Sequence, residues 1–288
     1  MKLLQYNTHL FLGTLAGLGP EYEDEVRLNA IINRINESGA DIVNLNEVWA
    51  DDIKDRIIAG TRRSFPYAFY EPNTDALKLG SGLLLLSKHQ FARKPKFTEY
   101  EQLVGWDAQS HKGFISATIP VKRDGPFFPC WVVITHTQSG TSKDEIRARR
   151  AGFEQLWKAV RGLPFGNNPL FVIGDLNVIG ESGGRPTAEY HYLTTKLGSL
   201  GLRDLFRYVH PESAADPGYT FDWQTNALVR KFTPGDKVQE RLDYFYARNL
   251  SDEERQLTVD VIRDFQYIDP QTSHMMDLSD HYPLQVTT

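Results

Sequence analysis

The chain has 288 residues, of which 41% are hydrophobic and 24% charged, and a formal net charge of −5. This composition is that of a globular protein and excludes an intrinsically disordered chain. No apolar run approaches the roughly 20 residues that a membrane-spanning helix requires, which excludes an integral membrane protein. The negative charge argues against a dedicated nucleic-acid-binding protein, because contacts to phosphate usually require a basic face.

The cysteine count and the first residues bear on the compartment of the protein. Cys130 is the only cysteine, so no intrachain disulfide can form, which favours a reducing compartment. Residues 1–6 read as a first strand that leads into polar Asn7, and they lack the features of a signal peptide. We therefore expect either a cytoplasmic protein or an exported one whose chain begins here after cleavage.

The predicted elements begin with this first strand and continue with a helix. Leu28, Ile31, Ile32 and Ile35 have the spacing of a helix with one buried stripe, which Gly39 ends. A buried strand over residues 41–46 follows directly. Three strand candidates then occupy residues 82–87, 113–119 and 130–135. No helix of comparable length separates these three, which predicts that neighbouring strands there are antiparallel.

A second helix is predicted from the apolar spacing of Phe153, Leu156, Trp157 and Val160. It carries the densest basic cluster (Arg147, Arg149 and Arg150), which we interpret as a solvated face. Further strands are predicted over residues 169–173, 219–223, 242–247, 257–265 and 283–286. Many strands with few long helices predict an α/β fold with two packed sheets and helices outside them. Because no repeat or linker divides the chain, we expect one domain over residues 1–288 and a monomer.

Several predicted strands end in a carboxylate, a histidine or an asparagine. Such placement projects polar groups from one edge of a sheet into a shared space, where active sites are commonly built. The candidates are Asn7, Glu47, His136, Asp175, Asn177, Asp243, Asp280 and His281.

Glu47, Asp175, Asn177 and His136 each have a catalytic and a structural interpretation. Glu47 is a hard oxygen ligand that suits magnesium, or an acid that stabilises a helix N-terminus. The Asp175 carboxylate can orient a water and the Asn177 amide can donate to a phosphoryl oxygen, unless the pair only forms an Asx turn. His136 can donate to phosphate or to a leaving oxygen, and its alternative is a structural histidine.

Asp280 and His281 offer an adjacent metal ligand and general base, although Ser-Asp also makes a good turn. Asp243 lies in an otherwise apolar strand and needs a partner if it is buried. A histidine held in one tautomer is one candidate partner, and a salt bridge to Arg241 or Arg248 is the other.

Taken together, Asn7 and the motifs NEVW, THTQ, GDLN, RLDY and SDHYP resemble the endonuclease/exonuclease/phosphatase superfamily across the whole chain. This resemblance implies a four-layer α/β/β/α sandwich with two mixed β-sheets packed face to face, and metal-dependent cleavage of phosphate esters. The segments VNLNEVW, SGLLLLSK, HKGFISATI and YTFDWQTNALVRKF are similar to the bacterial sphingomyelinase branch. In the last segment, Thr220, Asp222, Thr225 and Asn226 fall where sphingomyelinases carry a similar pattern.

The resemblance also implies a role for each candidate. Glu47 would be the main Mg²⁺ ligand, with Asn7 and Asp280 completing the metal site and Mn²⁺ or Ca²⁺ as alternative ions. His281 would be the general base, oriented by Asp243, and Asp175 would position the attacking water. The substrate phosphate would be bound by Asn177, His136 and Lys112.

The resemblance therefore implies a magnesium-dependent phosphodiesterase that cleaves a phospholipid, sphingomyelin, to ceramide and phosphocholine. An endonuclease or nucleotide phosphodiesterase on the same scaffold is the alternative, with nucleic acid as its substrate, and a non-catalytic binding protein is a third. Bacterial sphingomyelinases usually carry a long aromatic-tipped hairpin where residues 267–278 are short here. We accordingly expect only weak peripheral membrane contact, through Met275 and Met276.

Overall fold

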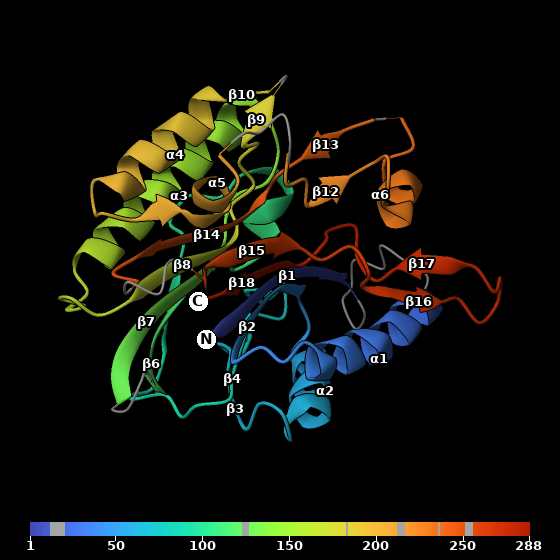
Figure 1. Cartoon of the computed structure of the whole chain (residues 1–288). Coiled ribbons are helices and arrows are strands. Elements are labelled where there is room, and N and C mark those ends of the chain that lie inside the picture. The colour runs from blue at the N-terminus through green and yellow to red at the C-terminus, as the bar shows by residue number, and fades with distance from the viewer. Residues whose placement is uncertain (12–20, 123–126, 183, 212–216, 236, 251–255) are drawn as a thin grey trace.

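Two six-stranded sheets form the centre of the molecule (Figure 1). The structure is a computed structural model, which describes the chain except for residues 12–20, 123–126, 183, 212–216, 236 and 251–255. The first sheet consists, in spatial order, of β15 (Thr258–Val261), β18 (Leu284–Thr287), β1 (Lys2–Leu10), β2 (Ile42–Val48), β4 (Leu84–Ser87) and β3 (Tyr67–Phe69). The second consists of β11 (Arg203–Asp204), β14 (Asp243–Arg248), β8 (Leu170–Asp175), β7 (Phe127–His136), β6 (Gly113–Lys122) and β5 (Lys96–Glu99).

Each sheet contains one parallel pair, and each parallel pair is linked by a long helix. Strands β1 and β2 are connected through α1 (Glu21–Glu37), and β7 and β8 through α3 (Lys143–Arg161). Two parallel neighbouring strands need such a crossover, because the chain must return to the same end of the sheet before the second strand begins. The other neighbouring strands within the two sheets run antiparallel. Both sheets are therefore mixed.

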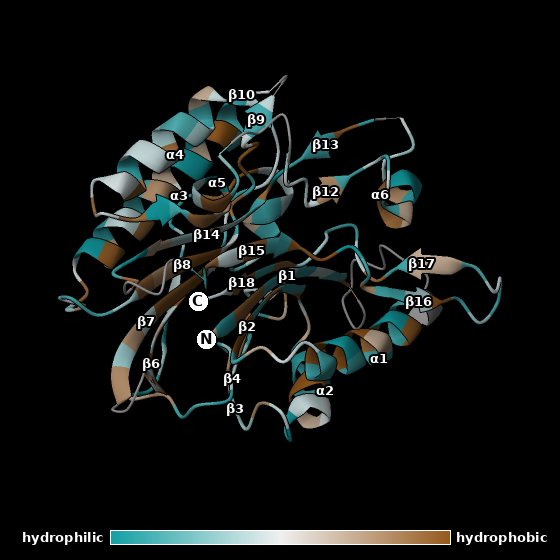
Figure 2. Cartoon of the chain, viewed as in Figure 1, coloured by the Kyte–Doolittle hydropathy of each residue, from teal (hydrophilic) through white to brown (hydrophobic). Residues whose placement is uncertain are grey.

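Three hydrophobic cores separate the layers. One core lies between the sheets and includes Leu3 and Ile42 from the first and Ile173 and Phe245 from the second. A second core packs α1 and α2 (Asp51–Thr61) on the first sheet, and a third packs α3 and α4 (Ala188–Gly198) on the second. Figure 2 shows hydrophobic residues concentrated on the strands, while the outer helices mix hydrophilic and hydrophobic positions. This arrangement confirms the predicted four-layer sandwich.

Shorter helices and pairs of short strands lie outside the two six-stranded sheets. They are the helices α5 (Leu205–Val209) and α6 (Ala227–Phe232), the 3₁₀ helix η1 (Gly105–Gln109), and the paired strands β9 (Glu181–Ser182) with β10 (Arg185–Pro186), β12 (Phe221–Asp222) with β13 (Gln239–Glu240), and β16 (Gln266–Ile268) with β17 (Met275–Asp277). None of the described helices is both long and apolar enough to cross a membrane.

Two strand predictions need correction. The strand predicted over residues 82–87 pairs with β2 and β3 in the first sheet and is not a neighbour of β6, because the chain changes sheet after β4. The strand predicted over residues 257–265 ends at Val261, because from Ile262 the chain turns toward β16. Phe265 packs instead into the core below α1.

The basic cluster of α3 is only partly a solvated face. Arg147 is exposed, but Arg149 is buried and forms a bidentate pair with Glu189 of α4, at 2.9 and 2.7 Å. Its remaining guanidinium nitrogen donates to the backbone oxygens of Gln138 and Gly140, both at 2.8 Å. A buried charge is stable only when its donors are hydrogen-bonded. The bonds that Arg149 makes link α4 and the loop after β7 to α3.

Candidate active site

The predicted polar residues meet at one edge of the two sheets. Asn7 and Glu47 come from the carboxyl ends of the parallel strands β1 and β2, and His136 and Asp175 end the parallel strands β7 and β8. Asp243 begins β14, which runs antiparallel to β8, and its Cα is registered directly against that of Asp175. Strand direction therefore brings residues far apart in sequence to the same edge.

Asn7 connects the two sheets at this edge. Its Nδ2 donates to Glu47 Oε1 within the first sheet and to Asp175 Oδ2 in the second, both at 2.9 Å. Its Oδ1 accepts from the backbone nitrogen of His9 at 3.1 Å. Since Asn7 is buried, these bonds fix the separation of the Glu47 and Asp175 carboxylates.

His281 and Asp243 form a buried dyad. The Nδ1 of His281 lies 2.8 Å from Asp243 Oδ2, and its Nε2 lies 3.9 Å from Asp175 Oδ2. Burial alone would lower the pKa of His281, but the charge and the hydrogen bond of Asp243 raise it well above its ordinary value. The salt bridge considered as an alternative for Asp243 is not formed, because Arg241 pairs with Glu181 and Asp204.

Asp175 combines both of the roles considered for it. Its Oδ1 accepts from the backbone nitrogen of Asn177 at 2.9 Å, which is an Asx turn, while its Oδ2 faces Asn7 and His136. Burial and the neighbouring charge of Asp243 raise the pKa of the Asp175 carboxyl to about 7. One amide hydrogen of Asn177 is donated to Thr137 O at 3.1 Å, which leaves the second for a ligand.

His136 is buried between the carboxylates of Glu47 and Asp175. Its Nε2 lies 3.8 Å from Glu47 Oε1 and 3.6 Å from Asp175 Oδ2, and its Nδ1 has no hydrogen-bond partner among the described residues. Burial and the positive charge of Lys112 lower the pKa of His136 to about 3. His136 is therefore neutral near pH 7, and one of its nitrogens carries a proton that it can donate.

Three residues at this edge adopt left-handed backbone conformations. The φ angles of Glu47, Asn177 and His9 are 59°, 50° and 47°. Non-glycine residues pay for this conformation in free energy, and such strain clusters at functional sites. His9 was not among the sequence candidates, because a histidine within the first strand has no feature that distinguishes it from a structural one.

His9 places a nitrogen between two carboxylates. Its Nδ1 lies 3.2 Å from Asp280 Oδ2 and 3.6 Å from Glu47 Oε2. Burial alone would lower the pKa of His9, but Asp280 and Glu47 raise it. Burial alone would raise the pKa of Glu47, and His9 holds it well below its usual range. The surroundings of Glu47 therefore favour the charged carboxylate.

The residues at this edge fit a divalent metal ion. Glu47, His136 and Asp175 offer three ligand atoms within 4.8 Å of one another. Glu47 and Asp280 add carboxylate oxygens on either side of His9. The Asn7 amide lies beside them, with its Nδ2 bonded to Glu47 and its Oδ1 bonded to the backbone nitrogen of His9. Ionised carboxylates with an amide oxygen are the hard ligands that Mg²⁺ prefers. Because Asp280 and Glu47 raise the pKa of His9, these carboxylates favour positive charge at this position.

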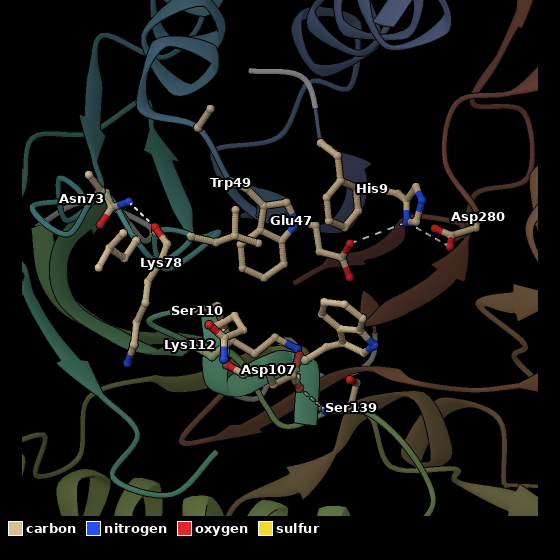
Figure 3. Close-up of a pocket in the computed structure, with 18 residues that line it drawn as sticks. His9, Glu47, Trp49, Asn73, Lys78, Asp107, Ser110, Lys112, Ser139 and Asp280 are labelled. Atoms are coloured by element: carbon tan, nitrogen blue, oxygen red, sulfur yellow. Dashed lines mark hydrogen bonds and ion pairs between the residues drawn. The ribbon is translucent and has the colours of Figure 1, made fainter. Parts of the chain in front are cut away.

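A cavity of about 910 Å³ opens beside these residues (Figure 3). Of the predicted site residues, Glu47, Lys112 and Asp280 line it. Lys112 is buried, and its Nζ donates to Asp107 Oδ2 at 2.9 Å and to Thr137 O at 3.1 Å. Asp107 also accepts from the backbone nitrogen of Ser139 at 2.6 Å. The sequence did not single out Asp107, because an acid in a polar loop resembles many others.

Buried amide side chains hold Asp243 and Asp175 in position. They were not among the candidates from the sequence. Gln5 Nε2 donates to Asp243 Oδ1 at 3.0 Å and to Asn46 Oδ1 at 2.5 Å. Asn46 Oδ1 also accepts from the backbone nitrogen of Asp175 at 3.2 Å. The available signal was the presence of amide side chains inside the otherwise apolar strands β1 and β2.

The segment YTFDWQTNALVRKF braces the loop that carries Asp280 and His281. Thr220 Oγ1 accepts from the backbone nitrogen of Asp243 at 3.3 Å, and Asn226 Nδ2 donates to Ser279 O at 2.9 Å. Phe221 forms a β-bridge with His281, and their rings lie 5.3 Å apart. This segment therefore contributes to the position of the dyad.

Comparison with known proteins identifies similar sequences and structures. A sequence model described as the Endonuclease/Exonuclease/phosphatase family matches residues 4–281. Among curated proteins, no sequence matches the chain.

Solved structures share the fold over almost the whole chain. A mutant of beta toxin from Staphylococcus aureus with bound magnesium ions is 20% identical, with a TM-score of 0.75 over 100% of this chain and 99% of that one. Sphingomyelinase C from Streptomyces griseocarneus is 23% identical, with a TM-score of 0.75 over 99% and 98%. Truncated TDP2 from Caenorhabditis elegans is 17% identical, with a TM-score of 0.65 over 99% and 95%.

Proposed function

The chain belongs to the endonuclease/exonuclease/phosphatase family, and on that premise we propose that it is a Mg²⁺-dependent phosphodiesterase acting on a phospholipid of the sphingomyelin type. The observation that carries the proposal is the convergence of the His281–Asp243 dyad with the carboxylates of Glu47 and Asp175 at one sheet edge. A base, a held water and a cation site are the three components that metal-assisted hydrolysis of a phosphate ester requires.

His281 is the proposed general base. With Nδ1 bonded to Asp243, the other ring nitrogen, Nε2, is directed toward Asp175 Oδ2. In the neutral form of His281, which a bound cation would favour, a water held by Asp175 can transfer its proton to Nε2 as its oxygen attacks phosphorus. Asp243 stabilises the resulting imidazolium, and general-base assistance of this kind contributes about 10² to 10⁴ in rate.

His136, Asn177 and Lys112 are proposed to stabilise the phosphate. The second amide hydrogen of Asn177 and the proton carried by neutral His136 are hydrogen-bond donors toward phosphoryl oxygens. Lys112 contributes a fixed positive charge at the cavity wall, held by Asp107. A hydrogen bond from neutral His136 can also stabilise the leaving oxygen, which then takes its proton from solvent water. These groups act on negative charge that grows as the phosphorus–oxygen bond breaks.

Glu47, Asn7 and Asp280 would hold the metal ion. When bound, Mg²⁺ supplies charge stabilisation for the phosphoryl and leaving oxygens and lowers the pKa of the nearby histidines.

The sphingomyelin-type substrate is supported by two observations. Beta toxin and sphingomyelinase C have the same fold over nearly their whole length. The cavity beside Glu47 is bordered by Phe11, Trp49 and Leu79, which suit a substrate with an apolar part. The net charge of −5 gives a nucleic-acid substrate less support.

A magnesium-dependent substrate panel tests the proposal. The purified chain is assayed with sphingomyelin micelles, phosphatidylcholine micelles, abasic duplex DNA and a soluble diester, each with Mg²⁺ and with EDTA. We expect release of phosphocholine from sphingomyelin that EDTA abolishes. Cleavage of DNA alone would replace the lipid substrate with the nuclease alternative, and no turnover of any diester would refute the proposal.

A matched pair of glutamate variants tests the metal site. Glu47→Gln is expected to lower magnesium-dependent turnover at least about 100-fold and to weaken Mg²⁺ binding measured by calorimetry. Glu71→Gln makes the same chemical change at an exposed loop position and should alter neither quantity. Equal Mg²⁺ affinity in the two variants would exclude Glu47 as a ligand.

A further inference from the structure

Two large apolar side chains stand almost fully exposed at the same cavity that Glu47 and Lys112 line. Leu77 is 89% exposed and Trp106 is 91% exposed, and both border the cavity. Leaving a leucine and a tryptophan in water is unfavourable by roughly 25 cal/mol per Å² of apolar surface. Paired exposure at the mouth of a binding cavity therefore indicates a surface that a ligand or partner covers.

The backbone connects these two side chains into one structure, which we call the rim (Leu77 and Trp106). Leu79 N donates to Gln109 O at 2.8 Å, and His111 N donates to Leu79 O at 3.1 Å. These bonds join the loop of Leu77 to the end of η1, which carries Trp106. Leu77 N is itself held by Asp75 Oδ1 at 2.8 Å. The rim is thus preorganised in its exposed position.

The rim is also anchored to the polar end of the cavity. Asp107, the residue after Trp106, accepts from Lys112 Nζ at 2.9 Å and from Ser139 N at 2.6 Å. On the other loop, Asn73 Nδ2 donates to Lys78 O at 2.8 Å. Figure 3 shows Trp49 between Lys78 and Asn73 on one side and Glu47, His9 and Asp280 on the other. The apolar side chains of Trp49 and Leu79 line the same cavity as the rim and Glu47.

We propose that the rim enters a zwitterionic lipid surface and holds the apolar arm of the substrate while its phosphate lies at Glu47. Tryptophan and leucine together suit acyl chains and the headgroup boundary, where amphipathic rings are favoured. A chain with a net charge of −5 gains no attraction to anionic lipids, so the surface is zwitterionic. This inference rests on the proposed lipid phosphodiesterase activity and assigns its membrane contact to the rim.

Vesicle binding in EDTA tests the rim without turnover. The full chain is sedimented with vesicles of phosphatidylcholine and sphingomyelin, as wild type and as Leu77→Ser with Trp106→Ser. We expect the double variant to lower the partition coefficient at least about tenfold, which corresponds to about 1.4 kcal/mol of lost burial for the two side chains together. Phe127→Ser alters another exposed apolar residue, outside the cavity, and should leave partition within about twofold.

The hairpin β16–β17 provides the competing contact. Ile268 and Met275 are its exposed apolar residues, at 63% and 58%. Loss of vesicle binding in Ile268→Ser with Met275→Ser, together with unchanged binding in the rim variant, would assign membrane contact to the hairpin and overturn the inference. Absence of wild-type vesicle binding would overturn it as well.

Two further readouts separate this inference from the proposed function. With Mg²⁺, the ratio of vesicle turnover to soluble-diester turnover should fall about tenfold in the rim variant. Wild-type hydrolysis of the soluble diester without vesicle binding would remove the rim inference and keep the phosphodiesterase. Vesicle binding without hydrolysis of any diester would remove the proposed activity and keep the lipid-binding rim. Single-stranded DNA binding that depends on Trp106, without vesicle binding, would replace lipid contact with base stacking.

Discussion

The cluster of polar residues at the sheet edge and the rim at the cavity mouth are built in opposite ways. His136, Asp175 and Asp243 are each 1% exposed and are held by strands of the central sheets, whereas the rim is about 90% exposed and is carried by a loop and the short 3₁₀ helix η1. Strand ends hold side chains in fixed geometry because the sheet ladders leave them little freedom. Loops tolerate substitution, so they are where substrate preference can vary while the reaction stays the same.

The largest expected effect is at the base. His281→Ala removes the proton acceptor, and we expect turnover of any accepted diester to fall by about 10³-fold or more. Thermal denaturation should be less affected than activity, since an alanine leaves Asp243 bonded to Gln5 and Thr220. His191→Ala, at an exposed position of α4, is the matched control and should retain full turnover. Retained activity in His281→Ala would remove this residue from the mechanism.

A smaller loss of turnover is expected at the residue that orients the base. Asp243→Asn keeps the side-chain shape and replaces the acceptor of the His281 Nδ1 proton with an amide. We expect a loss of about 10²-fold or more in turnover, because the ring is no longer held in the productive tautomer. Steady-state kinetics should show the loss in kcat with little change in KM. A loss confined to KM would instead indicate a substrate-binding role.

The acid sensitivity of the metal-free protein should report the burial of His136. Its folded pKa of about 3 lies below its ordinary value of 6.5, so only the unfolded chain binds this proton between those values. The contribution of neutral His136 to folding stability is therefore fully present above pH 6.5 and is lost as pH falls toward 3. Between pH 7 and pH 4, the free energy of unfolding measured with urea in EDTA should fall by about 1 to 3 kcal/mol less in His136→Asn than in the wild type. The same pH dependence of the free energy of unfolding in the two proteins would show that His136 is not held neutral.

The smallest effect on folding is expected at the rim, and a matched leucine makes the contrast measurable. Leu77→Ala should change the free energy of unfolding by less than about 0.5 kcal/mol, because its side chain is already in water. Leu45→Ala makes the same change at a fully buried position of β2 and should cost about 2 to 5 kcal/mol. A large loss at Leu77 would show that the rim is part of the folded core and not a free surface.

The sequence was most informative where one local pattern decided the structure. The spacing of Leu28, Ile31 and Ile35 predicted α1, and a capping box of Ser142 and Glu145 starts α3 ahead of its buried stripe. The apolar runs before Glu47 and Asp175 predicted β2 and β8; β8 is buried throughout, and β2 is buried at every position except Glu47. The sheet to which β4 belongs was not predictable, because strand pairing depends on partners distant in the chain.

The polar cluster shows the same division at the level of single residues. Strand-end position was enough to identify Glu47, Asp175 and Asp243 as candidates, because a charge directly after or within an apolar run requires an explanation. Gln5, His9 and Asp107 were not identified, because their importance lies in which atoms they contact. Arg149 was misinterpreted for that reason as well, since its partner Glu189 lies on a different helix.

By itself the sequence determined the two long helices α1 and α3, the main buried strands, the layered class of the fold, and the set of polar residues that end those strands. Apolar periodicity and turn residues act over a few neighbouring positions, so they can be read directly from the chain. Only the tertiary structure decided that His281 Nδ1 meets Asp243, that Asn7 joins the carboxylates of two sheets, and that Leu77 and Trp106 share one rim. Those contacts join segments far apart in the chain, and their geometry is fixed only when both sheets have packed around a common core.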